Sequence, residues 1–162
     1  MLAREETMSA PLLDTELDKV YPVINGEGSD SAMLDNSLEF MMMAGMDLPL
    51  AVMVTIPEPW QGDKTISRTK RDLYQYYAIL MEPWDGPASI LFSDGDVVGA
   101  VLDRNGLRPS RYYVTSDDRL ILSSEVGVLD IPADRIVEKS RLQPGRMLLV
   151  DTRAGRIIGD EA

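Results

Sequence analysis

The chain has 162 residues with 16 basic and 27 acidic side chains, a formal net charge of −11, and neither cysteine nor histidine. The missing residue types exclude disulfides, thiolate nucleophiles, cysteine-ligated iron–sulfur or zinc sites, and a Ser-His-Asp triad. The charge disfavours nucleic acid and anionic membranes as partners, and no apolar run reaches the roughly 20 residues that span a bilayer, so we expect a cytoplasmic protein.

The first half of the chain, to about Trp84, has the apolar periodicity of helices. Residues 1–20 are acidic and predict a poorly anchored lead-in, with a short helix that Pro22 ends. Polar residues at 28–31 then offer N-capping side chains for a helix that Gly45 stops. The apolar stripe of this helix is Leu34, Leu38, Met41 and Met42.

Two further helices are expected before Trp84. Asp47 and Pro49 predict a short helix to about Thr55. After a surface loop at 61–67, a third helix is expected over residues 68–81. Its predicted buried residues are Leu73, Tyr76, Tyr77, Leu80 and Met81.

From about Pro87 onward, short β-rich runs alternate with turn residues, which is typical of antiparallel hairpins. The expected strands are 88–93, 97–103, 111–115, 119–123, 146–151 and 156–158. Because helices come first and strands later, the sequence predicts an α+β fold.

Three motifs suggest chemistry but are better explained by structure. Ser67 and Lys70 have the Ser-x-x-Lys spacing of penicillin-interacting serine enzymes, yet the companion motifs are absent and Ser67 stands where a helix cap belongs. Residues 94–96 (Asp-Gly-Asp) lack the later ligands of a calcium loop and predict a turn. Asp30 and Asp35 lie about 140° apart around a helix, so they cannot share one acid–base site.

Two segments remain as candidate binding sites. Gly28, Ser29 and Asp30 open a helix, where free N–H groups suit an anion and the carboxylate suits an ammonium, so together they can hold a zwitterion such as an amino acid. Plain helix capping is the simpler alternative. In segment 103–109, two arginines flank an Asn-Gly turn and offer guanidinium groups to a carboxylate, and a purely structural role is the alternative.

The chain around these segments resembles the glutamine-hydrolysing domain of the glutamate synthases. The similarity runs from about Tyr21 to the last residue, and its most specific parts are 81–87 (Met-Glu-Pro-Trp-Asp-Gly-Pro) and 102–109 (Leu-Asp-Arg-Asn-Gly-Leu-Arg-Pro). The resemblance implies that residues 21–162 are the carboxyl-terminal part of a class II glutamine amidotransferase domain. That domain has the four-layer αββα sandwich of N-terminal-nucleophile hydrolases.

The resemblance also implies a chemistry. In this family an N-terminal cysteine attacks the side-chain amide of glutamine, and the ammonia reacts with 2-oxoglutarate at a distant centre. That centre uses FMN, an iron–sulfur cluster and a reductant (NADPH, NADH or ferredoxin), whereas no cofactor is implied for this chain itself. The family motif places Asp30 at the α-amino group of glutamine, beside Ser29 and Gly28. The candidate pocket loop consists of Arg104, Asn105, Gly106 and Arg108.

The chain departs from the family in lacking the nucleophile, because it contains no cysteine. The family's oxyanion Asn-Gly lies far upstream of the Gly-Ser-Asp motif, so we interpret the dipeptide Asn25-Gly26 as a coincidence. We therefore expect a fragment that is inactive alone, that needs the missing upstream part of its domain, and whose uncovered strands favour self-association. The alternatives are a non-catalytic amino-acid-binding or subunit-interaction module, and a carboxylate-only enzyme, which the spacing of Asp30 and Asp35 disfavours.

Overall fold

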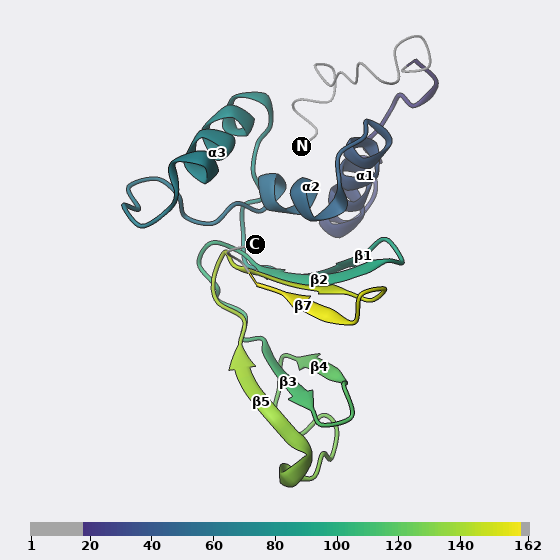
Figure 1. Ribbon diagram of the computed structural model, residues 1–162. Helices are drawn as coiled ribbons and strands as arrows, with labels where there is room; N and C mark the ends of the chain where they lie inside the picture. The colour runs from purple at the N-terminus through teal and green to yellow at the C-terminus, as the bar shows by residue number, and fades with distance from the viewer. Residues whose placement is uncertain (1–17, 160–162) are drawn as a thin grey trace. The chain divides into compact units, whose positions relative to one another are not determined.

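The computed structural model describes residues 18–159 (Figure 1), and the chain divides into two units between Trp84 and Asp85. The first unit contains three α-helices and the second contains two antiparallel sheets, so the predicted α+β order is confirmed. The short helix predicted before Pro22 lies mostly outside the described residues, although Asp18 and Lys19 have 3₁₀ geometry. Within residues 18–159, no helix combines the length and the apolar character needed to cross a membrane.

Helix α1 (Asp30–Met43) begins and ends where its capping residues predict. The Ser29 hydroxyl accepts a hydrogen bond from the Ala32 N–H at 3.3 Å, and Gly45 has a φ of 90° just beyond the last turn. The buried residues are Leu34, Ser37, Leu38 and Phe40. Met42, which was expected in the apolar stripe, is exposed. The buried face of the helix is centred between Leu34 and Ser37, and Met42 lies outside it.

Helix α2 (Leu48–Thr55) contains almost only apolar residues and contacts both α1 and α3 within the first unit (Figure 1). Ala51, Val52 and Thr55 have no exposed surface. The Thr55 hydroxyl donates to the Ala51 carbonyl at 2.7 Å, so the buried polar group is satisfied within the helix. A helix that is apolar on all sides is stable only when buried, which accounts for its central place in the first unit.

Helix α3 (Arg68–Leu80) is capped by Ser67, whose hydroxyl accepts from the Lys70 N–H at 3.2 Å. Its one buried residue is Tyr74, which stacks on Trp60 with ring centroids 6.4 Å apart. The prediction that Tyr76 and Leu80 are buried is wrong, since they are 59% and 52% exposed. Both lie on the side of the helix opposite Tyr74, and it is the Tyr74 side that faces the rest of the unit.

The second unit has a four-stranded sheet with the order β1-β2-β6-β7 and a three-stranded sheet with the order β4-β3-β5 (Figure 1). The strands are β1 (Ser89–Ser93), β2 (Val97–Leu102), β3 (Arg111–Thr115), β4 (Leu120–Ser123), β5 (Ile136–Arg141), β6 (Met147–Asp151) and β7 (Arg156–Ile158). Strand β5, which follows a short 3₁₀ helix η3 (Ala133–Arg135), was not predicted. Its sequence IVEKSR lacks apolar alternation, and the strand is mostly exposed.

A small core joins the two sheets of the second unit. Its buried members are Ala100, Leu102, Leu142 and Leu148, with Tyr112, Leu120 and Leu122 of the three-stranded sheet packed against them. Ala100 pairs directly with Leu148 across β2 and β6, so these residues share one face of the four-stranded sheet. The same face also carries Leu91, which pairs with Ala100, and farther along the strands Val98 and Ile157; all three are exposed.

Candidate functional site

The first candidate segment, Gly28 to Asp30, lies at the N-terminus of α1. The Gly28 N–H donates to the Asn25 carbonyl at 3.0 Å, and a Cβ on Gly28 would approach that oxygen to 3.1 Å, so a glycine suits this tight turn. Ser29 is the capping residue, and Asp30 occupies the first helical position with its side chain exposed. The carboxylate is therefore not needed as a cap, although its charge is favourable at a helix N-terminus.

The neighbouring Asn25-Gly26 dipeptide has a local structural role. The Asn25 N–H donates to Asn36 Oδ1 at 3.0 Å, and the Asn25 side-chain oxygen accepts from the Glu27 N–H at 3.1 Å. These bonds shape the turn that leads into α1 and tie it to the second turn of the helix.

The second candidate segment, 103–109, connects β2 to β3 and thus passes from one sheet to the other. Its anchor is Asp103, which is 3% exposed. The carboxylate accepts from the Ala88 N–H at 3.0 Å and from the Asn105 N–H at 2.9 Å, so both oxygens are bonded where water is excluded. The role of Asp103 was not predicted from the sequence, although an Asp that opens a turn and can accept from the N–H two residues on is a recognisable Asx-turn signal.

The two arginines of this segment do not converge as a free carboxylate clamp. Arg104 Nη2 lies 3.2 Å from Asp85 Oδ1, in the turn that precedes β1, and Arg108 is exposed. An exposed pair such as Arg104–Asp85 contributes at most about 1 kcal/mol, so a ligand carboxylate can compete for it. The Arg104 guanidinium therefore remains available to a ligand.

Gly106 is the position at which this loop tolerates no side chain. Its φ is 58°, and a Cβ would lie 2.4 Å from Pro144 Cγ. The left-handed backbone and the close approach of a rigid proline ring both require glycine.

We expect Gly106→Ala to lower the free energy of unfolding by about 2 to 4 kcal/mol, the sum of left-handed strain and overpacking. Gly155→Ala is the matched control, because Gly155 has a φ of 62° but nothing within 4 Å of the added Cβ. It should cost only about 1 kcal/mol. Urea unfolding of both variants measures the difference, and equal losses would show that Pro144 does not restrict the loop.

The motifs set aside in the sequence have structural partners. Lys70 Nζ lies 2.5 Å from Glu58 Oε1 and so pairs with a carboxylate instead of Ser67, whose hydroxyl caps α3. Asp94 Oδ1 accepts from the Val97 and Asp96 N–H groups, both at 2.9 Å, and these bonds hold the pKa of Asp94 below its ordinary value. In the described part of the chain, no three acidic side chains gather in a way that would hold a metal ion.

The candidate residues thus form two local groups, one in each unit. Gly28, Ser29 and Asp30 belong to the first, and the loop with Arg104, Asn105, Gly106 and Arg108 belongs to the second. Each group is organised by hydrogen bonds and packing within its own unit.

Comparison with known proteins shows what the whole chain resembles. Residues 1–162 match the family described as class-II glutamine amidotransferases. The NADPH glutamate synthase large chain of Bacillus subtilis is 51% identical over 161 residues, which cover 99% of this chain and 11% of that protein. The NADH glutamate synthase of Schizosaccharomyces pombe is 54% identical over 162 residues, which cover 99% of this chain and 8% of that protein. A ferredoxin-dependent glutamate synthase of Synechocystis is 44% identical over 161 residues, which cover 98% of this chain and 10% of that protein. The chain spans about a tenth of the length of these relatives.

Proposed function

Because the chain belongs to the class-II glutamine amidotransferase family, we propose that it is part of the glutamine-hydrolysing domain of a glutamate synthase and supplies part of its glutamine pocket. The observation that carries the proposal is the similarity of nearly the whole chain to glutamate synthases that use three different electron donors. The reaction proposed for the whole protein converts glutamine and 2-oxoglutarate, with a reductant, into two molecules of glutamate.

Asp30 is the residue proposed to recognise the substrate. Its carboxylate is exposed at the first position of a 14-residue helix and would pair with the α-ammonium of glutamine. The backbone N–H groups in the first turn of the same helix, directly after Gly28 and Ser29, would favour the α-carboxylate. The loop carrying Arg104 and Arg108 is proposed as a second binding element, which is described within its own unit, with Asp103 and Gly106 as its internal supports.

The nucleophile must come from elsewhere in the polypeptide. Attack on an amide needs an activated nucleophile, and the chain has no cysteine to form a thioester. The role proposed for this chain is therefore to bind and orient glutamine, while an N-terminal cysteine in the remainder of the domain breaks the amide bond.

The cofactors also belong to the remainder. For the whole protein we propose FMN, an iron–sulfur cluster and NADPH, NADH or ferredoxin as reductant, in a cytoplasmic enzyme. Iron–sulfur clusters are ligated mainly by cysteine thiolates, which this chain does not have. Its own residues are thus assigned no part in electron transfer.

The experiment that tests the proposed function is reconstitution of glutaminase activity. The chain is mixed, or co-expressed, with the cysteine-bearing remainder of a class II domain, and ammonia release from glutamine is measured with and without the chain. Activity that depends on both parts supports the proposal, whereas a remainder that is fully active without the chain contradicts it.

We further propose that the isolated chain self-associates or is only partly folded when dilute. The exposed fractions of Leu91, Val98 and Ile157 are 63%, 44% and 41%, and these residues share one face of the four-stranded sheet. The edge strands of that sheet are β1 and β7, which offer backbone groups to another strand. Apolar surface beside sheet edges favours association.

Sedimentation at low micromolar concentration should therefore show species larger than the 18.0 kDa chain. Val98→Lys should reduce the association, because it places a charge on the apolar face. Val137→Lys is the matched control, since Val137 is 65% exposed on the other sheet. A stable monomer with slowly exchanging amides throughout residues 88–158 would contradict this prediction.

A further inference from the structure

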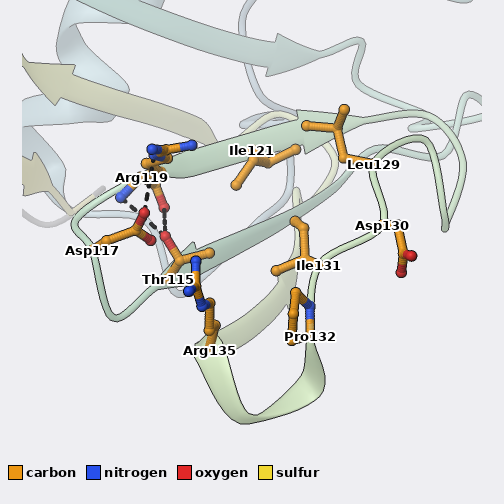
Figure 2. Close-up of a pocket in the computed structure, with 9 residues that line it drawn as sticks. All are labelled: Thr115, Asp117, Arg119, Ile121, Leu129, Asp130, Ile131, Pro132 and Arg135. Carbon is orange, nitrogen blue, oxygen red and sulfur yellow. Dashed lines mark hydrogen bonds and ion pairs between the residues drawn. The ribbon is translucent and has the colours of Figure 1, made fainter.

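A hollow of about 290 Å³ lies beside the three-stranded sheet of the second unit, between the β3–β4 turn and the segment that leads to η3 (Figure 2). The polar side chains of Thr115, Asp117, Arg119 and Arg135 gather at one end. Ile121, Leu129 and Ile131 line the other end, with Pro132 below them. None of these residues belongs to the proposed glutamine pocket.

The polar end is held in place by short local hydrogen bonds. Thr115 is 3% exposed, its hydroxyl accepts from the Arg119 N–H at 3.1 Å, and the Ser116 N–H donates to the Arg135 carbonyl at 2.8 Å. The β3–β5 register also shifts between Val114 and Thr115, and such bulges redirect the side chains beside them. The arginines therefore project from a fixed backbone, which reduces the entropy lost when a ligand binds.

Two of the three charged side chains that line this end are arginines, although the whole chain is acidic. Arg119 Nε lies 3.1 Å from Asp117 Oδ2, and Arg135 adds a second guanidinium at the same end. The Thr115 hydroxyl and then the charges of Arg119 and Arg135 hold the pKa of Asp117 below its ordinary value, so this carboxylate stays ionised at neutral pH. Two guanidinium groups and one carboxylate therefore line this end, and the second carboxylate of the hollow, that of Asp130, lies at the other end.

The opposite end has the character needed for an apolar group. Leu129 is 57% exposed, and Ile121 and Ile131 are half-buried beside it. Covering these side chains removes apolar surface from water, which favours binding of an aliphatic body but not of a small inorganic anion. Asp130 lies at this end, away from the arginines, and disfavours a second negative charge there (Figure 2).

We propose that the hollow is a binding site for a monocarboxylate with a branched aliphatic body, whose carboxylate lies at the Arg119–Arg135 end and whose body covers Ile121, Leu129 and Ile131. This chemistry is shared by a free branched-chain acid and by the carboxyl-terminal aliphatic residue of a peptide. The site is independent of glutamine binding.

Ligand-observed saturation-transfer NMR on the full 162-residue chain tests the proposal, with 4-methylpentanoate and N-acetyl-leucine as probes. N-acetyl-leucinamide, which has the same body without the charge, should bind about tenfold more weakly than N-acetyl-leucine, a ratio that corresponds to about 1.4 kcal/mol. Binding of both acids identifies a free acid as sufficient, and binding of N-acetyl-leucine alone identifies a peptide terminus; either result supports the site.

Two arginine variants locate the binding. Arg135→Gln should weaken N-acetyl-leucine binding about tenfold, whereas Arg141→Gln, an exposed arginine on β5 outside the hollow, should leave it unchanged. Equal effects of the two variants, equal binding of acid and amide, or no binding of either acid would each overturn the proposal. The comparison of acid with amide uses the unaltered chain, so it decides the question even if a variant does not fold.

Discussion

We expect no catalytic release of ammonia from glutamine by the isolated chain. Hydrolysis through a covalent intermediate needs a nucleophile and a base, and in a well-studied amide hydrolase these groups together account for a factor of about 10⁶ in kcat. The chain has neither cysteine nor histidine, and Ser67, the one serine with a lysine at catalytic spacing, caps α3 while Lys70 pairs with Glu58. Binding of glutamine alone would therefore leave its amide intact.

The measurement is an ammonia assay on the purified chain, on the cysteine-bearing remainder and on their mixture. A remainder whose nucleophilic cysteine is replaced by alanine is the control for contaminating glutaminase, because its mixture with the chain should also be inactive. Multiple turnovers by the chain alone, unchanged by adding the remainder, would show that the chain contains a nucleophile that its sequence does not reveal.

Local signals in the sequence predicted the helices well. Ser29 and Ser67 cap the N-termini of α1 and α3, and Gly45 follows the end of α1. Each of these signals involves only neighbouring residues, so a short sequence pattern predicts it, and the structure confirms all three. The buried face of α3 was predicted less well, because it depends on distant partners. Tyr74 donates to Glu58 at 3.2 Å and stacks on Trp60, and these contacts select its side of a helix that carries apolar residues on two sides.

The contacts that support the 103–109 loop also depend on residues distant in the sequence, so short sequence patterns did not predict them. The pattern Asp-Arg-Asn-Gly predicts a turn, but only the folded chain brings Asp103 to the Ala88 N–H, Arg104 to Asp85, and Gly106 to Pro144. The charges of Arg104 and Arg108 suggest a binding role, whereas the buried Asp103 carboxylate between β1 and the loop has the larger structural role. Strand β5 was missed because pairing with β3, rather than its own apolar pattern, makes it a strand.

The prediction that separates a substrate role from a structural role concerns Asp30. In the whole enzyme, we expect Asp30→Ala to raise the KM for glutamine by roughly 10- to 100-fold, because a hydrogen-bonded pair with an ammonium is worth about 1.5 to 3 kcal/mol. The cost in stability should be small. Ser29 provides the side-chain cap, so Asp30→Ala removes only a favourable charge near the helix end, which is worth about 0.3 to 1 kcal/mol.

Two variants on the same helix serve as controls. Asp35→Ala removes another exposed carboxylate of α1 and should leave KM unchanged, whereas Ser29→Ala removes the cap and should cost about 1 kcal/mol of stability. Asp30→Asn keeps the size of the side chain but not its charge, so a KM close to that of Asp30→Ala would assign the effect to the ion pair. If Asp30→Ala folds and keeps the KM of the unaltered enzyme, Asp30 does not bind glutamine, and its charge serves only the N-terminus of α1.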